Sequence, residues 1–198
     1  MKDLERFEQI YSSKKGYKTR FTILEYYTFY IHDQYTKEIL KLSKKLRYLD
    51  LASSQAKFSD GVTKHFNQII FSEITNSGIT FMKNKFKNKK NISVKKIDIS
   101  NFTLEEKAEI ITMASSLSYV DIKVFLKNIN LNLSKNGYFI FLDTLNNNFI
   151  YKFYRYLLNI VNPNYRSKKI LKQLINQNSL EIIKSNFKES RFKFYGNS

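Results

Sequence analysis

The sequence predicts an α/β fold: a doubly wound, mostly parallel sheet of seven strands with a C-terminal antiparallel hairpin and a helical N-terminal region. Three observations lead to this prediction. Short apolar segments alternate with segments of helical periodicity. The last two apolar segments are separated only by the polar residues KES, and the 198 residues suit one domain. Such alternation is typical of a parallel sheet, because each crossover helix returns the chain to the same end of the sheet.

The first half of the chain is predicted to alternate strands and helices after a helical start. Residues 3–11 fit a short helix, Gly16 indicates a turn, and apolar residues at helical spacing over 21–45 fit one long helix or two short ones. Beyond residue 45, apolar runs bounded by turn residues predict strands, and periodic segments predict helices between them. The strands are expected at 46–51, 68–72 and 92–97, and the helices at 58–66 and 75–86.

The second half repeats this pattern before it ends in the hairpin. The only proline, Pro163, follows a periodic segment and ends the helix predicted there. The helices are expected at 121–133, 149–161 and 167–176, and the strands at 108–113, 138–142, 180–187 and 191–195. No repeat or Pro/Gly/Ser-rich linker marks a boundary, so we expect a single domain over 1–198, with a helical cap at 1–45 and the core at 46–198.

The composition excludes several classes of site. Cysteine is absent, so disulfides and thiolate metal sites cannot form, and two histidines make a dedicated transition-metal site unexpected. No apolar run approaches the roughly 20 residues that span a bilayer, and the N-terminal residues lack the apolar core of a signal peptide. We therefore expect a cytoplasmic protein with no bound metal and no transmembrane segment.

The net charge of +17 allows two interpretations. A field of this size attracts phosphates, anionic glycans or an acidic membrane surface. Alternatively, the lysines of a chain rich in Lys, Asn and Ile are spread over solvated faces. We favour the second interpretation, because the basic runs at 14–18, 83–90 and 166–172 do not form one evident stripe.

Acidic residues stand at the ends of the first three strands of the predicted core. Asp50 falls in YLDL, Glu73 ends IIFSE, and Asp98 ends VKKID. Open α/β sheets bind ligands at the carboxyl ends of their strands. In the order and spacing of these segments the chain resembles the Rossmann-like, class I S-adenosylmethionine-dependent methyltransferases. The resemblance covers roughly residues 46–143 by motif and the remainder by element order.

The resemblance implies S-adenosylmethionine as the cofactor. In the family, a glycine-rich turn after the first strand admits the methionine part of the cofactor. Here Ala52, Ser54 and Ala56 occupy the usual glycine positions, so small side chains replace residues that tolerate φ > 0. The cofactor-binding residues implied by the resemblance are Tyr11, Asp50, Ala52, Ser53, Ser54, Glu73, Ile74, Asp98, Ile99, Ala114 and Ser115.

Two of these acidic residues have a plain structural alternative. By the resemblance, Glu73 accepts hydrogen bonds from both ribose hydroxyls, whereas a glutamate there could instead cap the next helix. Asp98 and the amide of Ile99 are implied to contact adenine, whereas an aspartate there could simply start a turn.

Candidate catalytic residues are few. The segment AEIITMASSLSYVD resembles the family's fourth strand and its cofactor-facing loop, where Ser118 and Tyr119 stand in place of the paired histidines of many small-molecule members. Tyr119 could face the acceptor or pack in the core. His32 lies in the region that forms a lid in the family, and its near-neutral pKa suits a base, although a packed or exposed helix residue is the commoner fate.

Three functions follow. The first choice is methylation of an oxygen or nitrogen on a small-molecule or carbohydrate acceptor. A nucleic-acid (RNA) methyltransferase would use the positive charge, but the sequence has no aromatic-basic motif of the kind used for base stacking. A noncatalytic relative that binds the cofactor or a partner is the third, because the usual glycines are replaced.

Overall fold

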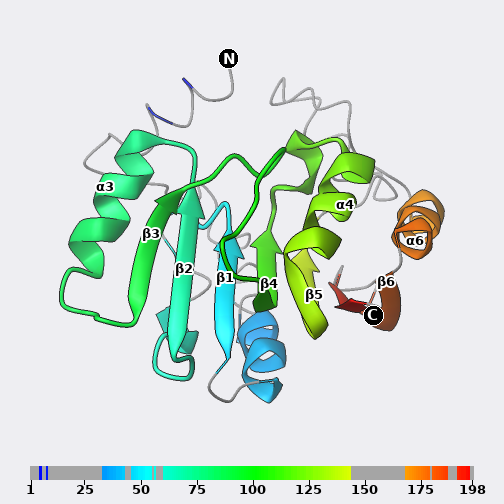
Figure 1. Cartoon of the computed structure of the whole chain (residues 1–198), viewed down its shortest axis with the longest axis horizontal. Coiled ribbons are helices and arrows are strands. Elements are labelled where there is room, and N and C mark those ends of the chain that lie inside the picture. The colour runs from blue at the N-terminus through cyan, green and yellow to red at the C-terminus, as the bar shows by residue number, and fades with distance from the viewer. Residues whose placement is uncertain are drawn as a thin grey trace, which may run out of the picture. The chain divides into compact units, whose positions relative to one another are not determined.

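The computed structural model describes residues 5, 8, 33–42, 46–54, 56, 60–143, 168–178, 180–186 and 191–196. The chain divides into two compact units, Met1–Asp98 and Ile99–Ser198. Each unit contains parallel strands joined by helices (Figure 1). The α/β class with mostly parallel strands is therefore as predicted.

The first unit contains three parallel strands in the order β3-β2-β1. The apolar runs become strands because both faces are covered, so that Leu49, Phe71 and their neighbours are fully buried. Helix α3 packs on β2 and β3 (Figure 1). The elements are β1 (Arg47–Leu51), β2 (Gln68–Glu73), α3 (Asn76–Lys85) and β3 (Ile92–Lys96).

Helix α3 begins and ends where its sequence provides caps. The hydroxyl of Thr75 accepts a hydrogen bond from the N–H of Gly78, which satisfies one of the unpaired donors of the first turn. At the other end the N–H of Phe86 bonds to the carbonyl of Met82. Lys83 and Lys85 lie in the last turn, where positive charge complements the helix dipole.

The helix predicted at 58–66 is wrong over the residues described there. Asp60–Val62 (η1) is a single 3-10 turn, and the N–H of His65 continues it with a bond to the carbonyl of Val62. Gly61 and the β-branched Thr63 have weak helix propensity, and a segment this short is marginal as a helix. The helical residues 33–41 agree with the helix predicted over 21–45, whereas the helix predicted at 149–161 lies outside the described residues.

The second unit contains four strands in the order β4-β5-β7-β6. Strands β4 and β5 are parallel, and β7 is antiparallel to both of its neighbours. No described helix has the length and apolar character needed to cross a membrane. The elements are β4 (Ala108–Ala114), η2 (Leu117–Tyr119), α4 (Ile122–Asn132), β5 (Leu133–Leu142), α6 (Lys168–Gln177), β6 (Leu180–Asn186) and β7 (Arg191–Gly196).

Strand β5 begins earlier than predicted because its first residues bulge. Ala108 of β4 pairs with Leu133 of β5, but Ile110 already pairs with Tyr138. The β5 segment from Leu133 to Tyr138 is therefore longer than the β4 segment that it faces. Asn136 takes the left-handed conformation, with φ of 63°. Gly137 is needed for space, because a Cβ there would lie 2.9 Å from the side chain of Leu133.

Candidate functional site

The turn after β1 holds three residues in the left-handed region. The φ angles are 51° for Ala52, 55° for Ser54 and 52° for Ala56. These are the three positions at which the sequence resemblance places glycines. A residue with a Cβ pays roughly 1–2 kcal/mol in this conformation, so surrounding contacts must hold the turn in place.

Hydrogen bonds to β2 supply those contacts. The N–H of Ser53 donates to the carbonyl of Ser72 at 2.7 Å, and the N–H of Ala52 donates to the Ser72 hydroxyl at 3.3 Å. The Ser53 hydroxyl donates to the carbonyl of Asp50 at 2.6 Å and accepts from the N–H of Ser72 at 3.2 Å. Ser72 is fully buried and was not identified from the sequence, although a serine inside the apolar run IIFSE was a usable signal.

Glu73 joins the ends of the first two strands. Its side chain is buried, with 5% exposure. One carboxylate oxygen accepts from the N–H of Ser54 at 3.0 Å, and the other from the N–H groups of Ile74 at 2.8 Å and Thr75 at 3.1 Å. A carboxylate has about four acceptor positions, so about one remains for a ligand. The structural alternative considered for Glu73 is thus partly realised, because it binds the N–H groups just before α3.

Gly78 allows α3 to approach this carboxylate. A Cβ on Gly78 would lie 2.7 Å from Cγ of Glu73 and 2.7 Å from the hydroxyl oxygen of Thr75. Contacts this short require one of the two side chains to move. Gly78 was also missed by sequence reasoning, since a glycine in a helix carries no local sign of what it packs against.

A second carboxylate binds the start of α3. Glu8 accepts from the N–H groups of Asn76 at 2.6 Å and Ser77 at 3.1 Å, and also from the Ser77 hydroxyl. Lys96 donates to the side chain of Asn76 at 2.9 Å. The Ser77 hydroxyl bond, followed by the two backbone bonds and the positive charge of Lys96, lowers the pKa of Glu8 below its ordinary value of 4.5. Glu8 therefore contacts the end of α3 that adjoins Glu73.

The remaining predicted residues of the first unit lie at the same ends of its strands. Asp50 is buried with 4% exposure, whereas Ile74 is an exposed apolar side chain directly after Glu73. The N–H of Ile97 donates to the carbonyl of Glu73, which brings the exposed Asp98 next to the end of β2. The candidate site of the first unit therefore combines a strained turn, a buried carboxylate and an exposed apolar residue.

The second unit has a related arrangement after β4. Ser115 takes φ of 56°, and its N–H donates to the carbonyl of Leu142 at 2.7 Å. Asp143, directly after β5, accepts from the N–H of Leu117 at 2.6 Å and is buried. Asp143 was missed, although an acidic residue at a strand end is the pattern that identified Glu73.

The predicted loop residues of the second unit differ in exposure. Ser118 is buried with 5% exposure, whereas Tyr119 is 43% exposed, so Tyr119 does not pack in the core. Ala114 ends β4 and is half-buried, as is Ile99 at the start of the unit.

Tyr11 and His32 lie outside the described residues. Among the residues that the structure describes, no group of three or more His, Cys, Asp or Glu side chains could hold a metal ion.

Comparison with known proteins gives matches at the level of structure. No protein-family model matches the sequence, and no curated protein sequence matches it significantly. The N-methyltransferase NodS from Bradyrhizobium japonicum WM9, in complex with S-adenosyl-L-homocysteine, is 14% identical, with a TM-score of 0.75 over 98% of this chain and 98% of that chain. A chain of the Haloferax volcanii complex that contains the Trm112 methyltransferase activator is 9% identical, with a TM-score of 0.76 over 97% and 98%.

The same fold also occurs in an enzyme with a different reaction in its name. The [4+2]-cyclase SpnF is 12% identical, with a TM-score of 0.64 over 77% of this chain and 58% of that chain. Fold alone therefore does not determine the reaction. The agreement with NodS and with the other methyltransferase structures shows that this chain has the Rossmann-like fold of the class I S-adenosylmethionine-dependent methyltransferases.

Proposed function

We propose that this protein is an S-adenosylmethionine-dependent methyltransferase that acts on an oxygen or nitrogen of a small-molecule or carbohydrate acceptor. One observation carries the proposal: the backbone keeps the left-handed conformation at Ala52, Ser54 and Ala56, beside the buried carboxylate of Glu73. A strained turn persists only where its surroundings impose it, and such strain concentrates at ligand sites. The similarity to NodS, an N-methyltransferase solved with S-adenosyl-L-homocysteine, supports the choice of cofactor.

The residues of the first unit suit different parts of this cofactor. The N–H groups of Ala52, Ser53, Ser54 and Ala56 are all bonded within the protein, so the turn would contribute its shape rather than hydrogen-bond donors. Glu73 retains about one acceptor position for a ribose hydroxyl. We assign Ile74 and Asp98 to the adenosine part, with Asp50, Tyr11, Ile99, Ala114 and Ser115 completing the proposed cofactor contacts.

Methyl transfer requires little more from the protein than correct positioning of the acceptor. The sulfonium of S-adenosylmethionine supplies an activated methyl group, so the chain has to align the acceptor for in-line attack and exclude water. We assign Tyr119 to acceptor contact, because its side chain is 43% exposed. His32 is the proposed base for an acceptor that loses a proton, since its pKa suits proton removal near neutrality.

The proposal also covers the domain organisation of the chain and its location in the cell. We propose one methyltransferase-like domain over 1–198, with a helical lid at 1–45 and a core at 46–198, in which the strands of both units form a seven-stranded sheet with a C-terminal hairpin. The similarity to NodS over 98% of the chain supports this organisation. A cytoplasmic location is part of the proposal, and the absence of cysteine is compatible with a reducing compartment.

Calorimetric titration with S-adenosylmethionine tests the cofactor. We expect saturable binding at one site per chain, weakened in Glu73→Ala by about 10- to 100-fold, because one hydrogen bond to a charged group contributes roughly 1.5–3 kcal/mol. Glu105→Ala removes the same charge from an exposed position and should keep the wild-type affinity. A folded Glu73→Ala protein with unchanged affinity would remove Glu73 from the site.

A second candidate function is a noncatalytic relative that binds the cofactor or a partner. The specific observation in its favour is that side chains occupy all three left-handed positions of the turn, where they narrow the space that glycine leaves open. Titration and turnover separate the two candidates. Binding of S-adenosylmethionine without formation of S-adenosylhomocysteine across a panel of hydroxyl and amine acceptors would favour the noncatalytic function.

A further inference from the structure

One segment of the first unit has a much higher density of positive charge than the mean of the chain. Residues 74–97 contain seven lysines and no acidic residue. At the mean charge density of the chain, 24 residues would carry a net charge of about +2. By contrast, residues 99–143 contain four lysines and five acidic residues. This segment therefore departs from the even spread of lysines that the whole sequence suggests.

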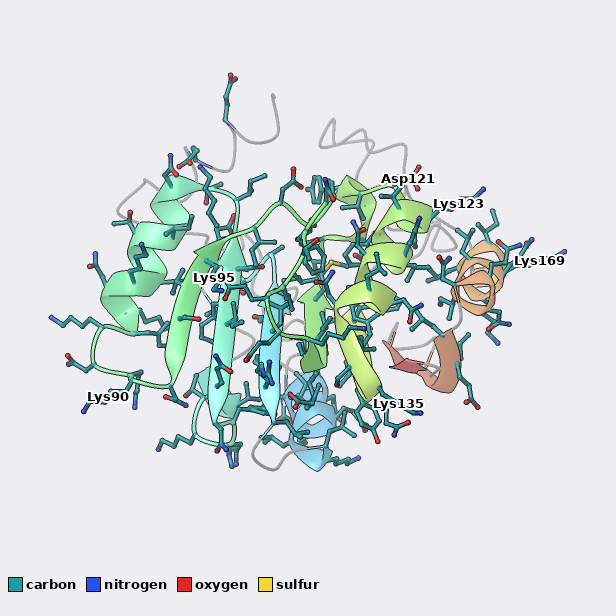
Figure 2. The ribbon with its side chains drawn as sticks, viewed as in Figure 1. Lys90, Lys95, Asp121, Lys123, Lys135 and Lys169 are labelled. Atoms are coloured by element: carbon teal, nitrogen blue, oxygen red, sulfur yellow. The ribbon has the colours of Figure 1, made fainter. Side chains whose placement is uncertain are left out.

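The fold gathers most of these lysines along one edge of the first unit. Strand β3 pairs only with β2 among the strands of that unit, so it forms the edge, and α3 packs beside it. Figure 2 shows Lys90 at the turn between α3 and β3 and Lys95 on β3. Lys85 is set apart, because its ammonium lies 5.3 Å from the centroid of the Phe86 ring. We call the following exposed residues the basic edge: Lys83, Lys87, Lys89, Lys90 and Lys95.

The charge of the basic edge is largely uncompensated. Within the part of the chain that the structure describes, the salt bridges are Lys37–Asp33 and Lys41–Glu38, and neither involves the basic edge. Lys96 is left out of the basic edge because it bonds to Asn76 near Glu8. An array of unpaired lysines on one edge attracts a polyanion by the release of its counterions.

The basic edge lies mostly at the opposite end of the strands from the candidate site. Lys87, Lys89 and Lys90 precede β3, whereas Glu73 and Asp98 follow the carboxyl ends of β2 and β3. A five-residue strand such as β3 is about 17 Å long. A polymer held at the basic edge is therefore not placed at the candidate site by that contact.

The chemistry of the edge favours a single-stranded nucleic acid over a membrane. The lysines come from the end of α3, the turn after it and β3, so they suit contact with several phosphates of one chain. Asn84 and Asn88 alternate with them in the sequence as further donors to phosphate oxygens. Phe81 is 42% exposed on α3, one turn before Lys85, where a base could stack on its ring. A membrane-surface helix would instead need a broad apolar face, but Thr80 and Asn84 lie exposed beside Phe81.

We propose that the basic edge binds the phosphate backbone of single-stranded nucleic acid, without sequence preference, with Phe81 as a stacking platform. This surface is separate from the proposed methyltransferase site and does not depend on it. The nucleic acid is a partner that is held by the protein, not the methyl acceptor.

Fluorescence anisotropy with a labelled oligouridine of about 20 nucleotides tests the proposal at a series of salt concentrations between about 50 and 200 mM. The triple variant Lys87→Ala/Lys89→Ala/Lys90→Ala removes three charges from the basic edge. The matched control Lys123→Ala/Lys127→Ala/Lys135→Ala removes three charges from exposed positions of the second unit. Figure 2 shows Lys123 on α4 and Lys135 on β5.

We expect the slope of log K against log salt to fall in magnitude by about 2 in the first triple variant, since each phosphate contact on a single strand contributes roughly 0.7. The control should keep the wild-type slope. Phe81→Ala should weaken binding about tenfold and leave the slope unchanged, because stacking is not ionic. Equal losses in both triple variants, or no binding by the wild type, would overturn the proposal. Lys-dependent binding to phosphatidylserine vesicles without binding to oligouridine would overturn it as well.

Discussion

The left-handed turn after β1 allows the effect of Ala52→Gly on the free energy of unfolding to be predicted. Ala52 has φ of 51°, a conformation that costs a residue with a Cβ roughly 1–2 kcal/mol. Glycine removes this cost, but the greater freedom of the unfolded chain lowers the free energy of unfolding by about 0.5–1 kcal/mol. The half-buried methyl group adds a few tenths of a kcal/mol to the loss. The net change in the free energy of unfolding is therefore expected to be near zero or slightly stabilising.

Ala114→Gly isolates the conformational contribution. Ala114 is also half-buried and ends β4 without a positive φ. Replacing Ala114 by glycine increases the freedom of the unfolded chain and removes a half-buried methyl group, but it relieves no strain. It should therefore lower the free energy of unfolding by about 1 kcal/mol. In urea unfolding followed by circular dichroism, the free energy of unfolding of Ala52→Gly should exceed that of Ala114→Gly by about 1–2 kcal/mol. Equal destabilisation in the two variants would refute the strained conformation of the turn.

Three further predictions concern the helix termini and their carboxylates. Gly78→Ala should push Glu73 out of place, lower stability by roughly 1–3 kcal/mol and weaken S-adenosylmethionine binding in calorimetry; a wild-type Tm and affinity would contradict the close contact. Asp121→Ala should cost about 1 kcal/mol in urea unfolding by removing the N-cap of α4, and Asp121→Asn should retain most of that stability. Because the pKa of Glu8 is lowered in the folded protein, its contribution is full above about 4.5 and is lost as the pH falls through the folded-state pKa. Stability measured from pH 6 down to about pH 3 should therefore decline less in Glu8→Gln than in the wild type, and parallel declines would exclude the contacts of Glu8 with Ser77.

The strands and the helices that follow them were predicted well, apart from the helix predicted at 58–66. Helix α3 and helix α4 were placed to within a few residues, because apolar periodicity and the caps Thr75 and Asp121 agree with each other. The segment 58–66 forms a 3-10 turn where it is described, because Gly61 and Thr63 have weak helix propensity.

The candidate site was predictable only in outline. Acidic residues at strand ends identified Asp50, Glu73 and Asp98, because parallel strands bring their carboxyl ends to one edge. Ser72 and Gly78 were missed, since their importance lies in what they contact: the turn after β1 and the side chain of Glu73. Neither contact has a local signature in the sequence.

The sequence by itself determined the alternation of strands and helices, the carboxylates at the strand ends and the lysine-rich segment after Glu73, because these depend on residue type and spacing along the chain. Only the tertiary structure decided the left-handed turn and the partners of Glu73. The N–H of Ser54 and the carboxylate of Glu73 are 19 residues apart, and the pairing of β1 with β2 brings them within 3.0 Å. Such distant hydrogen bonds hold the backbone at Ala52 and Ser54 in the left-handed region, although the intrinsic preference of alanine and serine favours negative φ.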